Sequence, residues 1–201
     1  MGLFDFFKKP PATNNLPDSF KKTKAKVEYH DNLYKRIGEI HNKYADGNNN
    51  SDYIVELESI IQSDPDSEVS VWDILMKLYI NAEQYNKAWA FSNKLILNQN
   101  VPTEKVRHEQ ARILKKEKKY IPATDMIMAE HLLKYSNRTT FNRNAFIKDA
   151  GVCTRALKWD EYMLEDMADI LESQLKKKDY DEGHLHNSYK KYLQSKGIKE
   201  E

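Results

Sequence analysis

The chain has 201 residues, with 32 basic and 31 acidic side chains, a formal net charge of +1, and 40% hydrophobic residues. This composition excludes a disordered polymer, because it supplies enough apolar side chains to build a core. The balanced charge provides no global field that would favour nucleic acid, so no nucleic-acid partner is expected. A mean hydropathy of −0.81 indicates amphipathic helices with wet outer faces.

The chain has one cysteine, Cys153, which excludes an internal disulfide and suits a reducing compartment. We expect Cys153 to be a small buried apolar residue and not a nucleophile. No apolar run approaches the roughly 18–20 residues that cross a bilayer. A cytoplasmic protein is therefore expected, with peripheral contact at the inner membrane face if its N-terminus binds lipid.

Residues 1–9, MGLFDFFKK, predict a short amphipathic helix. At about 100° per residue its apolar residues share one arc of about 160°, and its charged residues fill the rest. This segregation is typical of interfacial helices, and the stretch resembles the start of amphibian membrane-active peptides of the aurein type. The residues expected to dock on an anionic membrane or a partner are Leu3, Phe4, Phe6, Phe7, Lys8 and Lys9. Docking into the protein's own fold and a disordered tail remain open alternatives.

Residues 10–28 contain three prolines and many lysines, which predict a linker. Helical periodicity begins near residue 29 and predicts a helix over 30–45, with Leu33, Ile37, Ile40 and Tyr44 on one face. The sequence DGNNNS then ends this helix, and a second helix is expected to finish before Asp64–Pro65. A helical domain is predicted over 29–196.

Two consecutive helical hairpins are predicted over 71–102 and 103–136. Tyr120 and Ala123 follow Tyr85 and Ala88 by 35 residues (120 − 85 and 123 − 88). A period of this length with two helices per unit is typical of a helical solenoid. A looser third hairpin is predicted over 141–178, and a last helix is expected to end at Gly197.

The first of these hairpins resembles the tetratricopeptide repeat, whose pattern runs W-x2-L-G-x2-Y, then A-x3-F. Trp72, Leu75, Tyr79 and Ala88 match the pattern, whereas Met76 and Ser92 stand at the usual Gly and Phe positions. The second hairpin keeps small or apolar residues at the corresponding positions, but its Trp position holds an arginine: these residues are Arg107, Ala111, Leu114, Tyr120 and Ala123.

The resemblance implies an all-α, right-handed superhelix of about three to four hairpins with a C-terminal capping helix. An irregular helical bundle is the competing architecture. Members of the family bind peptide segments in a concave groove lined by the first helix of each hairpin. The corresponding positions here are Ser70, Asp73, Lys77, Ile80, Asn81, Lys105, His108, Arg112, Lys115 and Lys116.

We select Lys77, Asn81, Lys105, His108, Arg112 and Lys116 as the expected peptide-binding residues. The helix expected from residue 103 carries most of these basic side chains, so an acidic peptide or a C-terminal carboxylate is the expected ligand. The resulting prediction is a non-enzymatic adaptor or scaffold. A solvated helix face is the simpler interpretation of the same basic residues.

The sequence contains no motif that predicts catalysis. No phosphate-binding loop is present, and HEQAR carries Arg112 where a zinc-protease motif needs its second histidine. His184 and His186 would point about 200° apart on a helix, which disfavours a shared metal. No catalytic residue, metal, cofactor or small-molecule substrate is therefore expected. An alternative function is a soluble regulatory or immunity-type protein that inhibits a partner, with its N-terminal helix docked into its own fold.

Overall fold

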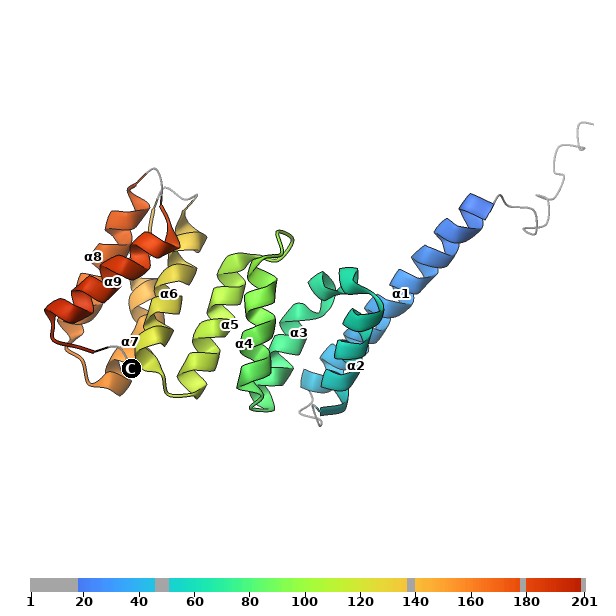
Figure 1. The fold of residues 1–201 in the computed structure, drawn as a ribbon, viewed down its shortest axis with the longest axis horizontal. Coiled ribbons are helices and arrows are strands. Elements are labelled where there is room, and N and C mark those ends of the chain that lie inside the picture. The colour runs from blue at the N-terminus through green and yellow to red at the C-terminus, as the bar shows by residue number, and fades with distance from the viewer. Residues whose placement is uncertain (1–17, 46–50, 137–139, 178–179, 200–201) are drawn as a thin grey trace, which may run out of the picture. The chain divides into compact units, whose positions relative to one another are not determined.

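The computed structural model describes residues 18–45, 51–136, 140–177 and 180–199 (Figure 1). Its described residues form α-helices and one short 3₁₀ turn, with no strand among them, which confirms the predicted all-α class. The chain divides into two compact units, residues 1–49 and 50–201. The helical domain predicted over 29–196 therefore spans the boundary between the two units.

The first unit contains one long helix, α1 (Asp18–Ala45). The helix begins inside the stretch predicted as a linker, because Pro17 suits a helix start and the lysines and alanines that follow favour helix formation. Its predicted apolar residues Leu33, Ile37 and Ile40 are buried. The membrane- or partner-docking segment 1–9 and most of the predicted linker lie outside the described residues.

The second unit consists of eight described α-helices and one 3₁₀ turn, which pack mainly against their neighbours in sequence (Figure 1). These elements are α2 (Ser51–Ser63), η2 (Pro65–Ser67), α3 (Glu68–Asn81), α4 (Tyr85–Ile96), α5 (Thr103–Lys116), α6 (Tyr120–Tyr135), α7 (Arg143–Leu157), α8 (Glu161–Leu175) and α9 (Glu182–Ser195). Helix α6 packs against four other helices, α5, α7, α8 and α9. Helix α9 returns to lie against both α6 and α8.

The same turn closes α3 and α5. Glu83 and Lys118, 35 residues apart (118 − 83), have left-handed backbone angles φ of 57° and 62°. In each turn a backbone amide bonds a carbonyl five residues earlier, at 2.9 Å from Gln84 to Tyr79 and at 2.8 Å from Lys119 to Leu114. This closure satisfies carbonyls that a helix end would otherwise leave unpaired. The 35-residue period of the sequence is therefore repeated in the backbone.

Helices α7 and α9 end in the same way, at Lys158 (φ 56°) and Gly197 (φ 72°). The intervals are longer here, 40 residues (158 − 118) and 39 residues (197 − 158). Helices α4 and α8, by contrast, have right-handed C-caps at Leu97 and Lys176. The left-handed closure therefore follows α3, α5, α7 and α9 and is absent after α4 and α8, and the longer intervals explain why the third hairpin is harder to align with the first two.

Small side chains occupy the helix contacts of the two regular hairpins. Ala88 and Ala123 are fully buried, and Ala111 is 1% exposed. Met76 and Ser92, which differ from the repeat pattern that the sequence resembles, are also fully buried. Close approach of the paired helices therefore tolerates both replacements.

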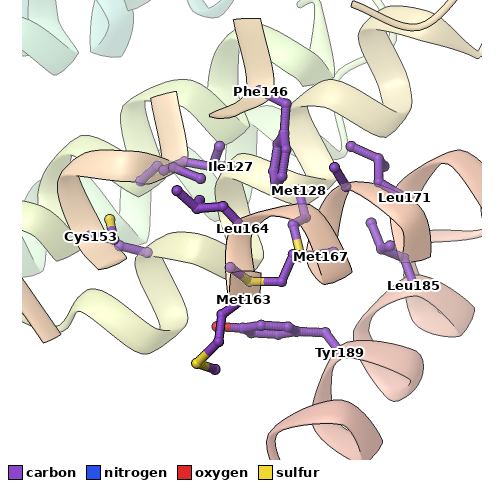
Figure 2. Packing of buried hydrophobic residues seen from close by; sticks show 14 of the residues in the cluster. Ile127, Met128, Phe146, Cys153, Met163, Leu164, Met167, Leu171, Leu185 and Tyr189 are labelled. Carbon is purple, nitrogen blue, oxygen red and sulfur yellow. The ribbon is translucent and has the colours of Figure 1, made fainter. Parts of the chain in front are cut away.

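One hydrophobic core cluster joins the five helices α5, α6, α7, α8 and α9 (Figure 2). Phe146 is fully buried and Tyr189 is 1% exposed, and Cys153 lies in the same cluster, as the sequence predicted. Burial raises the pKa of the Cys153 thiol. The chain's single thiol is thus a packing group of the core.

Candidate functional site

A groove of about 800 Å³ lies between α3, α5 and α6. Helices α3 and α5 contribute five lining residues each, and α6 contributes two. The lining residues are Val69, Ser70, Trp72, Asp73 and Lys77 from α3, Glu104, Lys105, His108, Glu109 and Arg112 from α5, and Glu130 and Lys134 from α6. The first helices of two consecutive hairpins therefore share one concave site.

Four of the six predicted peptide-binding residues line this groove: Lys77, Lys105, His108 and Arg112. Asn81 and Lys116 are exposed on the same two helices but lie outside the lining. Ile80, which the family register also placed in the groove, is 1% exposed and belongs to the core. The predicted residues that line the groove thus lie in the first three turns of α3 and α5, and those outside it lie towards the C-terminal ends of these helices.

The sequence reasoning missed the contribution of α6. Glu130 and Lys134 lie one helical turn apart on this helix and reach the groove. The family pattern gave no reason to include them, because it takes the groove from first helices only. Their four-residue spacing, which places both charges on one face of α6, was the available signal.

The charges of the groove balance, which differs from the strongly basic character that the sequence suggested. The lining contains four carboxylates against four Lys or Arg side chains, besides His108. Lys77 Nζ lies 2.7 Å from Asp73 Oδ2, and Arg112 Nη1 lies 2.7 Å from Glu109 Oε2. These acidic partners come one turn earlier on the same helix, so each neutralises a cation locally.

His108 and Glu130 join α5 to α6 across the groove. The distance from His108 Nδ1 to Glu130 Oε2 is 3.0 Å. The imidazole is half exposed, whereas the Glu130 side chain is only 12% exposed. The hydrogen bond to Glu130 raises the pKa of His108, and this effect exceeds the opposing effect of burial.

Two lining lysines are not committed to a carboxylate. Lys105 is exposed and has no charged partner among the described residues. The Lys134 ammonium lies 5.8 Å from the ring centroid of Tyr135, a cation–π contact that leaves its charge uncompensated. Glu104 lines the same end of the groove and likewise has no described ion pair. Lys105, Lys134 and Glu104 can therefore bind a ligand by releasing water, without breaking an ion pair within the protein.

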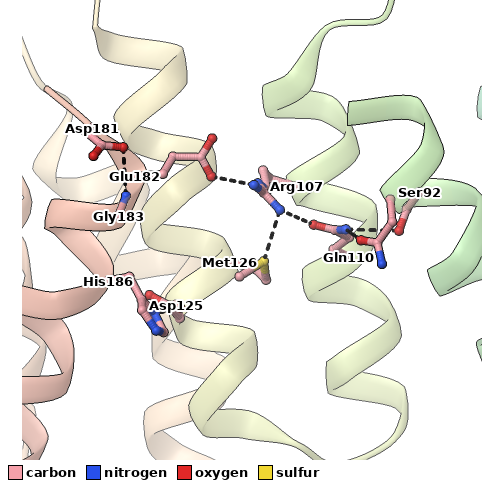
Figure 3. Close-up of polar contacts among 10 residues, drawn as sticks. Ser92, Arg107, Gln110, Asp125, Met126, Asp181, Glu182, Gly183 and His186 are labelled. Carbon is pink, nitrogen blue, oxygen red and sulfur yellow. Dashed lines mark hydrogen bonds and ion pairs between the residues drawn. The ribbon is translucent and has the colours of Figure 1, made fainter. Parts of the chain in front are cut away.

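Polar contacts on another face of α5 hold the surrounding helices (Figure 3). Arg107, at the position of the family's Trp, contacts Glu182 of α9 at 2.7 Å and Gln110 at 2.8 Å. Gln110 in turn donates to Ser92 of α4 at 3.0 Å. His186 of α9 bonds Asp125 of α6. These contacts fix α4 and α9 against α5 and α6, and they lie away from the groove.

The histidines of α9 lie outside the groove. His184 and His186, separated on α9 as the sequence predicted, pair with Asp181 and Asp125 respectively. No group of three or more His, Cys, Asp or Glu side chains in the described part of the chain is placed to hold a metal ion. The helices of this same part include none long and apolar enough to cross a bilayer.

Comparison with known proteins returned no relative. No protein-family model matches the chain, and no significant match was found among curated proteins or among solved structures.

Proposed function

We propose that the protein is a non-enzymatic adaptor of the tetratricopeptide type that binds a segment of a partner protein in the groove of α3, α5 and α6. The observation that carries the proposal is the convergence of Lys77, Lys105, His108 and Arg112 on that groove. The repeated turn after α3 and α5 supports it further, because equivalent closures make the two helices equivalent walls of one surface.

A polypeptide segment suits the groove better than a small molecule. The site is shallow and is lined mostly by charged side chains, with Val69 and the edge of Trp72 as its apolar part. Small-molecule pockets are usually enclosed and mostly apolar, whereas peptide grooves offer spaced polar groups along a surface. The uncommitted Lys105 and Lys134 favour a segment with acidic side chains.

A binding function without catalysis is consistent with the chemistry of the groove. Its carboxylates Asp73, Glu109 and Glu130 are each held by a neighbouring cation or imidazole. The thiol of Cys153 is buried in the core and cannot reach a substrate. We place the protein in the cytoplasm, with residues 1–9 giving weak contact to the inner membrane face, because segregated Phe and Lys side chains favour an anionic interface.

Charge reversal at Lys105 tests the proposal. The full chain is used to capture proteins from its native cell, in parallel with the Lys105→Glu and Lys116→Glu variants. Lys116 is the matched control, since it is exposed on the same helix but lies outside the groove. We expect Lys105→Glu to lose partners that the wild type and Lys116→Glu both retain. Equal capture by all three proteins would contradict binding in this groove.

A further inference from the structure

We propose that His108 determines the specificity of the groove: held by Glu130, its imidazole selects a segment that places an Asp or Glu side chain against it, and it holds that segment more tightly as the pH falls. The inference rests on the proposed peptide-binding function. It adds the chemistry of one contact and the condition under which that contact forms.

The Glu130 contact fixes which nitrogen of His108 carries the proton. A carboxylate only accepts hydrogen bonds, so the Nδ1 atom, 3.0 Å from Glu130 Oε2, must donate. The other ring nitrogen, Nε2, has no hydrogen-bond partner within the described parts of the chain. Because the half-exposed ring lines the groove, Nε2 is the atom available to a ligand.

Protonation reverses what Nε2 can bind. In the neutral ring Nε2 is an acceptor, and it cannot pair with the carboxylate of a ligand. In the imidazolium form both nitrogens donate, so Nε2 makes a charge-assisted hydrogen bond to such a carboxylate. The hydrogen bond to Glu130 raises the pKa of His108, which brings the charged form closer to neutral pH.

The other charged groups around His108 do not oppose the binding of a carboxylate, because their charges balance. The charged groups that line the groove with it or act on it electrostatically are Asp73 and Lys77 of α3, Glu104, Lys105, Glu109, Arg112 and Lys115 of α5, and Glu130 and Lys134 of α6. Helix α4 also packs on α5 but contributes no residue to the lining, and Glu182 of α9 meets α5 at Arg107 on another face. Since the lining charges balance, protonation of His108 makes the groove net positive.

Peptide selection supplies a probe for the unidentified ligand. A random library of 12-residue peptides with amidated C-termini is selected on the full chain at pH 6, so that only side chains carry carboxylates. We expect the selected peptides to contain an acidic residue whose change to the amide weakens binding. Fluorescence anisotropy should show about tenfold tighter binding at pH 6 than at pH 8, because the protonated ring makes a charge-assisted hydrogen bond that the neutral ring cannot make.

The His108→Asn variant isolates the imidazole. Its amide nitrogen lies close to the place of Nδ1 and can still donate to Glu130, but it does not titrate. The affinity difference between pH 6 and pH 8 should disappear in this variant and persist in His184→Asn, which alters an exposed histidine outside the groove. A pH difference that survives His108→Asn, or is absent from the wild type, would overturn the inference while leaving the proposed function intact.

Failure of the proposed function has a different signature. If no peptide is selected, or if the selected peptides bind Lys105→Glu as well as wild type, the groove is not the binding site and both proposals fail. A ligand-free measurement tests the pair itself: in NMR titration, Glu130→Gln should lower the pKa of the His108 ring. An unchanged pKa would overturn the inference directly, because the contact that orients the ring would be absent.

Discussion

Lys118 takes the same left-handed backbone conformation as Glu83, 35 residues before it, and closes α5 as Glu83 closes α3. Neither residue is glycine, although left-handed geometry is strained for side chains with a Cβ atom. The hydrogen-bonded closure therefore imposes a conformation that these side chains do not favour.

Replacement of Lys118 by glycine should stabilise the protein by about 0.5–1 kcal/mol, because it relieves this strain. Lys148→Gly is the control, since Lys148 is exposed within α7, where glycine should cost about 1 kcal/mol. Urea unfolding followed by circular dichroism measures both changes. A lower free energy of unfolding for Lys118→Gly would contradict the proposed backbone strain at this position.

His131 should make the protein less stable in acid. Its Nε2 lies 3.0 Å from Asp149 Oδ2, while its Nδ1 is buried without a described partner. Burial lowers the pKa of His131, so the unfolded chain binds the proton more readily than the folded chain. The contribution of His131 to stability is complete above about pH 6.5 and is lost as the pH falls below that value.

The measurement is the free energy of unfolding from pH 5 to pH 8, in a His108→Asn background that removes the opposite pH dependence of His108. We expect His131→Gln to be less stable at pH 8, because it loses aromatic packing, and to show a flatter decline towards pH 5. Parallel pH profiles for the two proteins would mean that His131 does not titrate with folding.

The ion pair between Arg107 and Glu182 should couple α5 to α9. The two side chains are 19% and 29% exposed, and their charged atoms are 2.7 Å apart. A double-mutant cycle with Arg107→Gln and Glu182→Gln should give a coupling of about 1 kcal/mol, above most exposed ion pairs because the site is partly desolvated. Lys24 and Glu28 of α1 provide an exposed control pair, for which we expect a smaller coupling. Strictly additive effects at Arg107 and Glu182 would show that the contact does not hold α9.

Deletion of residues 1–11 should abolish membrane association. The segment carries three Phe side chains, and residues 1–26 hold six Lys against two Asp. Burial of this apolar face with attraction to anionic lipid gives weak, salt-sensitive binding. The full chain should sediment with phosphatidylserine vesicles more than with phosphatidylcholine vesicles, and the shortened chain with neither. Equal sedimentation of both proteins would instead favour docking of the segment on a protein surface.

The sequence predicted the helices of the second unit because hydrophobic periodicity and Asp, Asn or Pro at the breaks are local signals. Four of the six side chains that it selected on α3 and α5 line the groove, since residues spaced three or four apart share a helix face. It could not predict the pairing of His108 with Glu130, which depends on how α5 crosses α6. The predicted start of the first helix was wrong: the linker was expected to continue to residue 28 because of its prolines and lysines, whereas α1 begins at Asp18.

The left-handed turns that close α3, α5 and α7 could not be predicted from the sequence. A glycine in the left-handed position is the usual sequence signal for a helix end. Among the four left-handed positions described, only the last holds glycine (Gly197), and the others hold Glu83, Lys118 and Lys158. Arg107 of α5 contacts Glu182 of α9, 75 residues later in the chain (182 − 107). Such contacts join residues far apart in the chain, and periodicity within one helix does not report them.

The packing of α6 against α7, α8 and α9 determines the smallest fragment in which the groove can fold. All groove residues lie between Val69 and Lys134, so a shortened protein ending near Ser136 would contain every one of them. Such a fragment would expose Ile127, Met128 and Leu132, which belong to the core shared with α7, α8 and α9. The groove therefore depends on a scaffold that extends through α9, more than fifty residues beyond its last lining side chain.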